Sequence, residues 1–193
     1  DLYVQDRGLK PEDLTVAIQG AGNAGLTTLQ ILAGEGYKVV AISDSTGGIY
    51  NENGLNEELV TAHRNPRQDL KDYEDDLGTT HITNEELLTL DVDILIPAAM
   101  EDQIDEELAP KVRAKIIVEA ANGPLTAAAD PILIDRGHTI LPDILCNSGG
   151  VTVSYFEWVQ NLQHVRWSED EVNEKLKEIM TNAYRTIKAE CEI

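Results

Sequence analysis

The sequence predicts an α/β fold, in which a doubly wound and mostly parallel sheet is followed by C-terminal helices. A short β-branched segment over 15–19 runs directly into a glycine-rich turn and then an amphipathic helix. Further apolar runs alternate with helical stretches as far as about residue 150, where longer helical patterns begin. Such alternation indicates a sheet covered on both faces, and these sheets bind ligands at the carboxyl ends of their strands.

The first strand–helix–strand unit is the clearest part of the pattern. The strand over 15–19 ends at Gly20, the helix ends near Gly34 or Gly36, and a second apolar strand covers 38–44. One side of the helix is expected to be buried, and it consists of Leu26, Leu29, Ile31 and Leu32.

Three more apolar runs predict strands over 92–97, 115–120 and 139–142. Between them, Thr83 to Glu86 resembles a capping box, and a helix over 126–136 is expected to stop at Gly137. The segment Asn51-Glu52-Asn53-Gly54 indicates a turn.

Two long helices are predicted after the sheet. The first carries an apolar stripe of Val151, Tyr155, Trp158, Val159 and Leu162. The second begins at a capping box over 168–171, and its apolar stripe consists of Val172, Leu176, Ile179, Ala183 and Ile187. We expect the second stripe to cover an apolar surface.

The charge balance excludes several classes of function. The chain has 193 residues with 35 acidic against 15 basic side chains, so its formal net charge is −20. Such a field repels the phosphates of nucleic acid, and no apolar run is long enough to span a membrane. We see no signal peptide and expect a cytoplasmic protein in which Cys146 and Cys191 are reduced thiols.

The acidic excess also suggests a salt-loaded cytoplasm, with an ordinary acidic protein as the alternative. Acidic runs repel one another in dilute salt, whereas the Debye length falls to about 3 Å in molar salt. A melting temperature that rises toward molar KCl is the expected result, and no rise would contradict a halophilic origin.

The glycine-rich turn has the spacing of a dinucleotide-binding, Rossmann-like fingerprint. In Gly20-Ala21-Gly22-Asn23-Ala24-Gly25 the first glycine permits the turn, Gly22 lets a pyrophosphate approach, and Gly25 lets the helix pack on the strand. Free amides at the helix start then meet the phosphates. The alternative is a glycine turn that only packs.

Asp44 ends the second strand, 24 positions after Gly20. There a carboxylate accepts hydrogen bonds from an adenine ribose and disfavours a 2′-phosphate, which favours NAD and leaves NADP possible. Arg64 is the one cation between Ser45 and Asn65, and no phosphate clamp is evident from the sequence. The alternative is that Asp44 caps the turn before Gly47.

Long irregular blocks resemble the nucleotide-binding domain of glutamate dehydrogenases, in the Glu/Leu/Phe/Val amino-acid dehydrogenase superfamily. The blocks lie at 17–23, 41–50, 97–99, 119–124 and 141–158, and the last is the most specific. The resemblance extends over most of residues 15 to 190.

The resemblance implies a set of site residues. Ala98 and Ala99 match the strand end that packs against the adenosine half, and Asn122 and Asn147 match contacts to the nicotinamide nucleoside. Ser154 matches the serine that holds the substrate's side-chain carboxylate. The predicted cofactor-binding residues are therefore Gly20, Gly22, Asn23, Ala24, Gly25, Asp44, Ser45, Ala98, Ala99, Asn122 and Asn147. By residue type alone, the asparagines could instead form turns and the serine could bond its own helix.

The chain departs from the family in three respects. Ala21 and Ala24 replace larger apolar residues at the turn, and the substrate domain with its catalytic lysine and aspartate is missing. We interpret the chain as a truncated or engineered piece with a residual linking helix over 1–13, a dinucleotide-binding domain over 14–150 and a helical extension over 151–193. No residue of the chain is predicted to be catalytic.

The resemblance implies oxidative deamination of glutamate to 2-oxoglutarate and ammonia by the complete enzyme, which is expected to be a hexamer. Alone, the chain should bind dinucleotide as a monomer or dimer without turnover. One alternative is a non-catalytic, self-associating module, because the stripe over 172–187 would lose its partner domain. Another is a leucine or phenylalanine dehydrogenase. The four histidines and two cysteines lack metal-site spacing, so no metal is expected.

Overall fold

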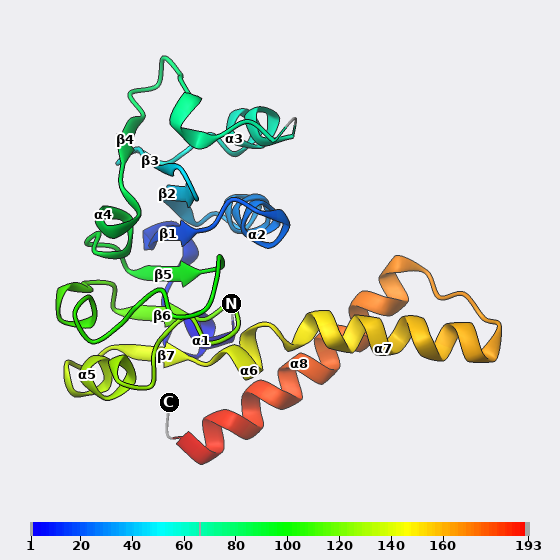
Figure 1. Cartoon of the computed structure of the whole chain (residues 1–193). Coiled ribbons are helices and arrows are strands. Elements are labelled where there is room, and N and C mark those ends of the chain that lie inside the picture. Colours follow the sequence, from blue (N-terminus) through cyan, green and yellow to red (C-terminus); the bar gives the residue numbers. More distant parts are fainter. Residues whose placement is uncertain (1, 66, 192–193) are drawn as a thin grey trace.

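Seven strands form one sheet in the order β4-β3-β2-β1-β5-β6-β7 within the residues that the computed structural model describes, 2–65 and 67–191 (Figure 1). The strands are β1 (Thr15–Gln19), β2 (Lys38–Asp44), β3 (Gly47–Tyr50), β4 (Thr80–Ile82), β5 (Ile94–Pro97), β6 (Ile116–Val118) and β7 (Thr139–Leu141). The pairs from β2 across to β7 are parallel, and β3 and β4 add antiparallel strands at one edge. The prediction of a mostly parallel sheet is confirmed.

The predicted strands are all present, and three of them are shorter than expected. Strands β5, β6 and β7 cover only 94–97, 116–118 and 139–141 of the runs over 92–97, 115–120 and 139–142. The sequence reading missed β3 and β4, because each is only three or four residues long and has no alternating apolar pattern.

The helices cover both faces of the sheet. They are α1 (Leu2–Asp6), α2 (Asn23–Gly34), α3 (Glu57–Arg64), α4 (Asn84–Leu88), α5 (Ala129–Asp135), α6 (Asp143–Cys146), α7 (Ser148–Gln163) and α8 (Glu169–Cys191). Helices α2 and α3 lie on one face, and α4 and α5 lie on the other (Figure 1). Asp1, Pro66, residues 192–193 and the side chain of Cys191 lie outside the described residues. The ends of the predicted linking helix over 1–13 and of the helical extension over 151–193, and the predicted reduced thiol of Cys191, are among them.

Most of the predicted start and stop signals have the expected geometry. Thr83 and Glu86 form a reciprocal capping box at α4, and Ser168 does the same with Glu171 before α8. Gly36 after α2 and Gly137 after α5 have φ of +91° and +84°, a conformation that glycine adopts readily. The predicted turn at 51–54 is closed by a backbone hydrogen bond from Gly54 to Asn51.

Alternate residues of the strands supply two apolar layers. Ile18 packs with Leu29 of α2 on one face, whereas Ala17 belongs with Leu87 and Leu133 to the layer on the other face. This double burial holds α2 and α4 on opposite sides of β1, so the carboxyl ends of β1 and β5 form an edge between the layers.

Helices α7 and α8 form an arm that projects from the sheet (Figure 1). The α8 stripe is covered at its carboxyl-terminal end, where Ala183 and Ile187 pack against the core beside the buried Tyr184, whereas Ile179 is 43% exposed. Helix α7 also carries exposed apolar side chains, of which Val151 is 70% exposed and Trp158 is 57% exposed. None of the described helices has the length and apolar character needed to cross a membrane.

Asp93 links the starts of neighbouring strands at the amino-terminal edge of the sheet. Its Oδ2 accepts hydrogen bonds from the backbone N–H and the hydroxyl of Thr15 at 3.0 and 2.9 Å, and its Oδ1 lies 2.8 Å from Lys115 Nζ. Burial alone would raise the pKa of Asp93, but these hydrogen bonds and the lysine charge hold the pKa below its usual 3.8.

Replacing Asp93 by Asn should therefore lower the free energy of unfolding at pH 7 by about 1 kcal/mol. A lowered folded-state pKa contributes stability above the unfolded pKa and loses it as the pH falls through the folded value. Urea titrations from pH 7 to pH 3 should show the two proteins converging below about pH 4. A difference in stability that does not change with pH would contradict this assignment.

Candidate functional site

The glycine-rich turn joins the carboxyl end of β1 to the start of α2, as the sequence predicts. The Gly20 N–H donates to the Ser43 carbonyl of β2 at 2.9 Å, and the Ala98 N–H donates to the Gln19 carbonyl at 2.7 Å. The turn is thereby fixed between the ends of β2 and β5. This position is the point where the chain passes to opposite sides of the sheet, at which open α/β sheets bind ligands.

Two glycines of this turn are required by space and backbone conformation. Gly20 has φ of +104°, and a Cβ there would lie 2.9 Å from the Ala98 carbonyl oxygen. A Cβ on Gly25 would lie only 1.7 Å from the Gly20 carbonyl oxygen, so α2 reaches β1 only without a side chain. The predicted roles of Gly20 in the turn and of Gly25 in helix packing agree with this geometry.

The third glycine has a different environment. Gly22 begins α2 with an ordinary φ of −82°, and nothing lies within 4 Å of a Cβ placed on it. The first backbone hydrogen bond of the helix runs from Leu26 to Gly22, so the amides of 23–25 precede the hydrogen-bonded turns. Asn23 and Ala24 are exposed, and the geometry suits an anionic group against the helix start.

Asp44 lies at the end of β2 and is fully engaged by the protein. Its Oδ1 accepts the Thr46 N–H and hydroxyl at 2.7 and 2.6 Å, and its Oδ2 accepts Arg64 Nη1 and the Leu70 N–H, both at 2.9 Å. Burial would raise the pKa of Asp44, but these donors and the guanidinium hold it below 3.8. Asp44 therefore caps the turn that follows it, which was the alternative to a role in ribose binding. Ser45 lies exposed on that turn.

Arg64 contacts both parts of the site, although the sequence predicted no role for it. The last turn of α3 brings its guanidinium to Asp44, and Nη2 also donates to the Ala21 carbonyl of the glycine turn at 3.3 Å. Its Nη1 additionally donates to the Gln68 carbonyl. A cation thus lies between the glycine turn and Asp44, and the amphipathic pattern of α3 was the available signal.

A cleft of about 640 Å³ opens at the ends of β5 and β6 and at the start of α7. Three predicted residues line it together, namely Ala99, Asn122 and Asn147. The Asn147 side-chain amide donates to Asn122 Oδ1 at 2.6 Å, so the two asparagines face one another across adjacent loops. Val151 completes the lining from α7.

Ser154 lies apart from these cleft-lining residues. It is on the exposed side of α7, and its hydroxyl donates to the Gly150 carbonyl one turn earlier at 3.1 Å. This is the back-bonded state that its residue type allows, so the hydroxyl must rotate away from Gly150 to donate elsewhere.

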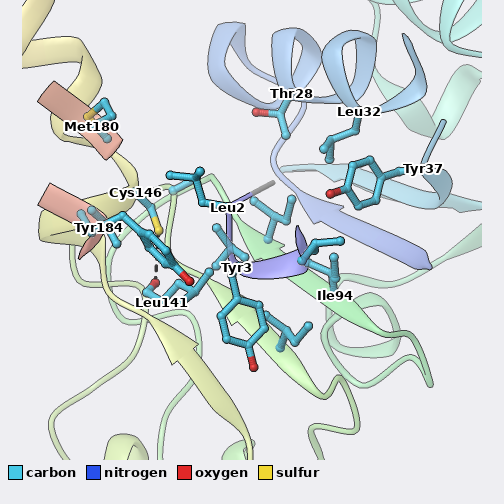
Figure 2. A pocket seen from close by; sticks show the side chains of 16 residues that line it. Leu2, Tyr3, Thr28, Leu32, Tyr37, Ile94, Leu141, Cys146, Met180 and Tyr184 are labelled. Atoms are coloured by element: carbon cyan, nitrogen blue, oxygen red, sulfur yellow. Dashed lines mark hydrogen bonds between the residues drawn. The ribbon is translucent and has the colours of Figure 1, made fainter. Parts of the chain in front are cut away.

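A second, apolar cavity of about 420 Å³ lies between α2, α8 and the sheet, and contains none of the predicted site residues (Figure 2). Leu32 and Thr28 point into it from α2, and Met180 and Tyr184 face them from α8. Cys146 lines the same cavity, where burial and then the charges of Glu119 and Asp143 raise the pKa of its thiol to about 12. Such a thiol stays protonated at neutral pH and serves as packing.

No cluster of three or more His, Cys, Asp or Glu side chains suited to a metal ion occurs in residues 2–65 and 67–191. His63 and His138 instead contact the backbone carbonyls of Asp69 and Ala114.

Comparison with known proteins agrees with this geometry. The profile described as Glutamate/Leucine/Phenylalanine/Valine dehydrogenase matches residues 2–193. The chain belongs to this family. It is 52% identical over 179 residues to NADP-specific glutamate dehydrogenase A1 of Halobacterium salinarum, and the match covers 93% of the chain. It is 47% identical over 184 residues to the catabolic NAD-specific glutamate dehydrogenase of Bacillus subtilis, with 95% of the chain covered.

The fold has solved counterparts in the same family. A hetero-hexameric glutamate dehydrogenase from Thermus thermophilus superposes with a TM-score of 0.84 and 32% identity over 99% of the chain. The chain spans 42% of the length of each of the two curated relatives and 44% of the Thermus chain.

Gly25→Ala and Gly22→Ala form a matched pair. Gly25→Ala should lower the free energy of unfolding by about 3 kcal/mol or more, because α2 must move off β1. Gly22→Ala should cost about 1 kcal/mol or less, since its Cβ points into open space and only a cap preference is lost. Urea denaturation followed by circular dichroism measures both, and equal losses would show that Gly25 is not the close contact.

Proposed function

We propose that this chain is the dinucleotide-binding part of an NAD(P)-dependent glutamate dehydrogenase. The observation that carries the proposal is the turn at Gly20, packed between the ends of β2 and β5 and open at Gly22. Family membership and glutamate dehydrogenase relatives of both cofactor types support it. The domain boundaries at 14–150 and 151–193 and a cytoplasmic location belong to the same proposal.

The dinucleotide would lie across the carboxyl ends of the strands. Its pyrophosphate would contact the exposed amides at Asn23 and Ala24, where Gly22 lets it come close. Its adenosine half would lie toward Asp44 and its nicotinamide half in the cleft at Asn122 and Asn147. Each asparagine offers both a donor and an acceptor, which match a carboxamide and a ribose.

When bound, the nicotinamide supplies the hydride acceptor, and the chain supplies orientation. The described residues that line the cleft include no lysine, and Glu101 is the ionisable group among them. Proton transfer from glutamate's amine is assigned to the complete enzyme, as the family resemblance implies. Ser154 would hold the substrate's side-chain carboxylate after its hydroxyl leaves Gly150, which favours glutamate over an apolar amino acid.

A non-catalytic, self-associating module is the second candidate function. It is favoured by the open apolar side chains of α7, which include Val151, Tyr155, Trp158 and Leu162. A mass that grows with concentration in light scattering, together with no dinucleotide binding, would favour it.

The cofactor is proposed to be either NAD or NADP, because Arg64 makes the site compatible with NADP as well. The sequence argument for NAD assumed an unpaired carboxylate at Asp44, whereas Arg64 neutralises it at 2.9 Å. A 2′-phosphate placed beside Asp44 would meet an ion pair, and a guanidinium binds phosphate oxygens well.

The purified chain should bind NADH and should not reduce NAD when glutamate is added. Isothermal calorimetry measures the first result, and absorbance at the NADH band measures the second. Gly22→Ala should weaken NADH binding by about tenfold or more, because its methyl group stands where the pyrophosphate approaches. Glutamate-dependent NADH formation by the chain alone would refute the assignment of proton transfer to another domain.

Arg64→Gln should weaken NADP binding about tenfold and change NAD binding by less than about threefold. The charge that pairs with the 2′-phosphate is lost, and Asp44 is left as an unpaired carboxylate nearby. Calorimetric titrations of the wild-type chain and of Arg64→Gln with NAD and NADP measure this. An equal loss of affinity for NAD and NADP would show that Arg64 does not determine the choice of cofactor.

A further inference from the structure

Two neighbouring loops carry the asparagines of the cleft. Strands β6 and β7 are adjacent and parallel, so the segments that leave their carboxyl ends, 119–124 and 142–147, run side by side. Asn122 lies on the first segment and Asn147 on the second. Both segments are irregular or only briefly helical, so hydrogen bonds between them must set their separation.

Two carboxylates link these segments reciprocally. Glu119 belongs to the first segment, and its Oε2 accepts the backbone N–H of Asp143 in the second at 3.0 Å. Asp143 belongs to the second, and its Oδ2 accepts the backbone N–H of Gly123 in the first at 2.9 Å. Each segment thus contributes one side chain that binds the backbone of the other.

Burying the Glu119 carboxylate between these two segments is energetically unfavourable by itself. Its residue is 7% exposed and directly follows the apolar strand β6. Burial and then the nearby charges of Asp143 and Asp130 raise the pKa of Glu119, while backbone N–H groups of Asp143 and Leu125 favour the charged form. A buried carboxylate is tolerated where such donors satisfy it, so the role of this side chain is its contact with the loop backbones.

The Asp143 carboxylate acts beside the first asparagine. It binds the N–H of Gly123, whose φ of +51° turns the chain immediately after Asn122. Its Oδ1 accepts the Ile144 N–H at 2.6 Å, and its carbonyl accepts the Asn147 N–H at 2.9 Å. One residue therefore fixes the backbone next to both asparagines.

We propose that Glu119 and Asp143 are positioning residues that hold Asn122 and Asn147 at the spacing required by the nicotinamide half of the cofactor. This inference rests on the proposed function. The hydrogen bonds that link the pair join the loops after β6 and β7, whereas the glycine turn follows β1 and Asp44 ends β2. Loss of the pair should therefore weaken contacts to the nicotinamide nucleoside and leave contacts to the adenosine and pyrophosphate intact.

The test separates the two halves of the cofactor. NADH fluorescence titration reports on the nicotinamide, and calorimetry with ADP reports on the half that lacks it. Glu119→Ala should weaken NADH binding about tenfold, reduce the fluorescence enhancement of bound NADH and change ADP binding by less than about twofold. Glu119→Gln keeps one acceptor oxygen and should lose less. Asp143→Asn is the second variant if Glu119→Ala does not fold.

Asp93→Asn is the matched control, because Asp93 is a partly buried carboxylate that binds backbone at the opposite edge of the sheet. It should leave NADH and ADP affinities unchanged. Equal losses of NADH and ADP binding in the Glu119 variants, or no loss of NADH binding, would overturn the inference alone. A wild-type chain that binds neither ligand would overturn the proposed function and this inference with it.

Discussion

The contact between Gly25 of α2 and the carbonyl of Gly20 fixes where the rest of the site lies. A single methyl group at Gly25 would lie 1.7 Å from that oxygen, so the helix can start directly on the end of β1 only because the side chain is absent. The contact aims the first amides of α2 along the carboxyl edge of the sheet. It also places the turn against Ala98, at the end of the neighbouring strand β5. Ligand contacts that follow the five parallel strands β2, β1, β5, β6 and β7 can then meet along one edge.

Electrostatics raises a separate difficulty, because a chain of net charge −20 is proposed to bind an anionic cofactor. The structure supplies local rather than global compensation. Amides at the start of α2 face the proposed pyrophosphate position, and Arg64 neutralises the carboxylate at the proposed ribose position. Charges nearer than the Debye length, about 8 Å at physiological salt, dominate over the distant surface field, so a few well-placed donors suffice.

The sequence predicts those features that depend on neighbours in the chain. The glycine spacing, the parallel strands and both capping boxes are local patterns, and the structure has them at the expected positions. The features that were missed depend on contacts between distant segments. Arg64 meets Asp44 only because α3 packs beside α2, and Glu119 meets Asp143 only because β6 and β7 are adjacent. A charged residue directly after a buried apolar strand was the available signal for Glu119.

The proposed site holds the dinucleotide in one orientation along the sheet edge, and a crystal structure of the chain with NADH bound tests this placement most directly. The predicted result has the adenine ribose beside Asp44, the pyrophosphate at Gly22 and the nicotinamide in the cleft that Asn122 and Asn147 line. A dinucleotide bound in the reverse orientation, or in the apolar cavity between α2 and α8, would contradict the account.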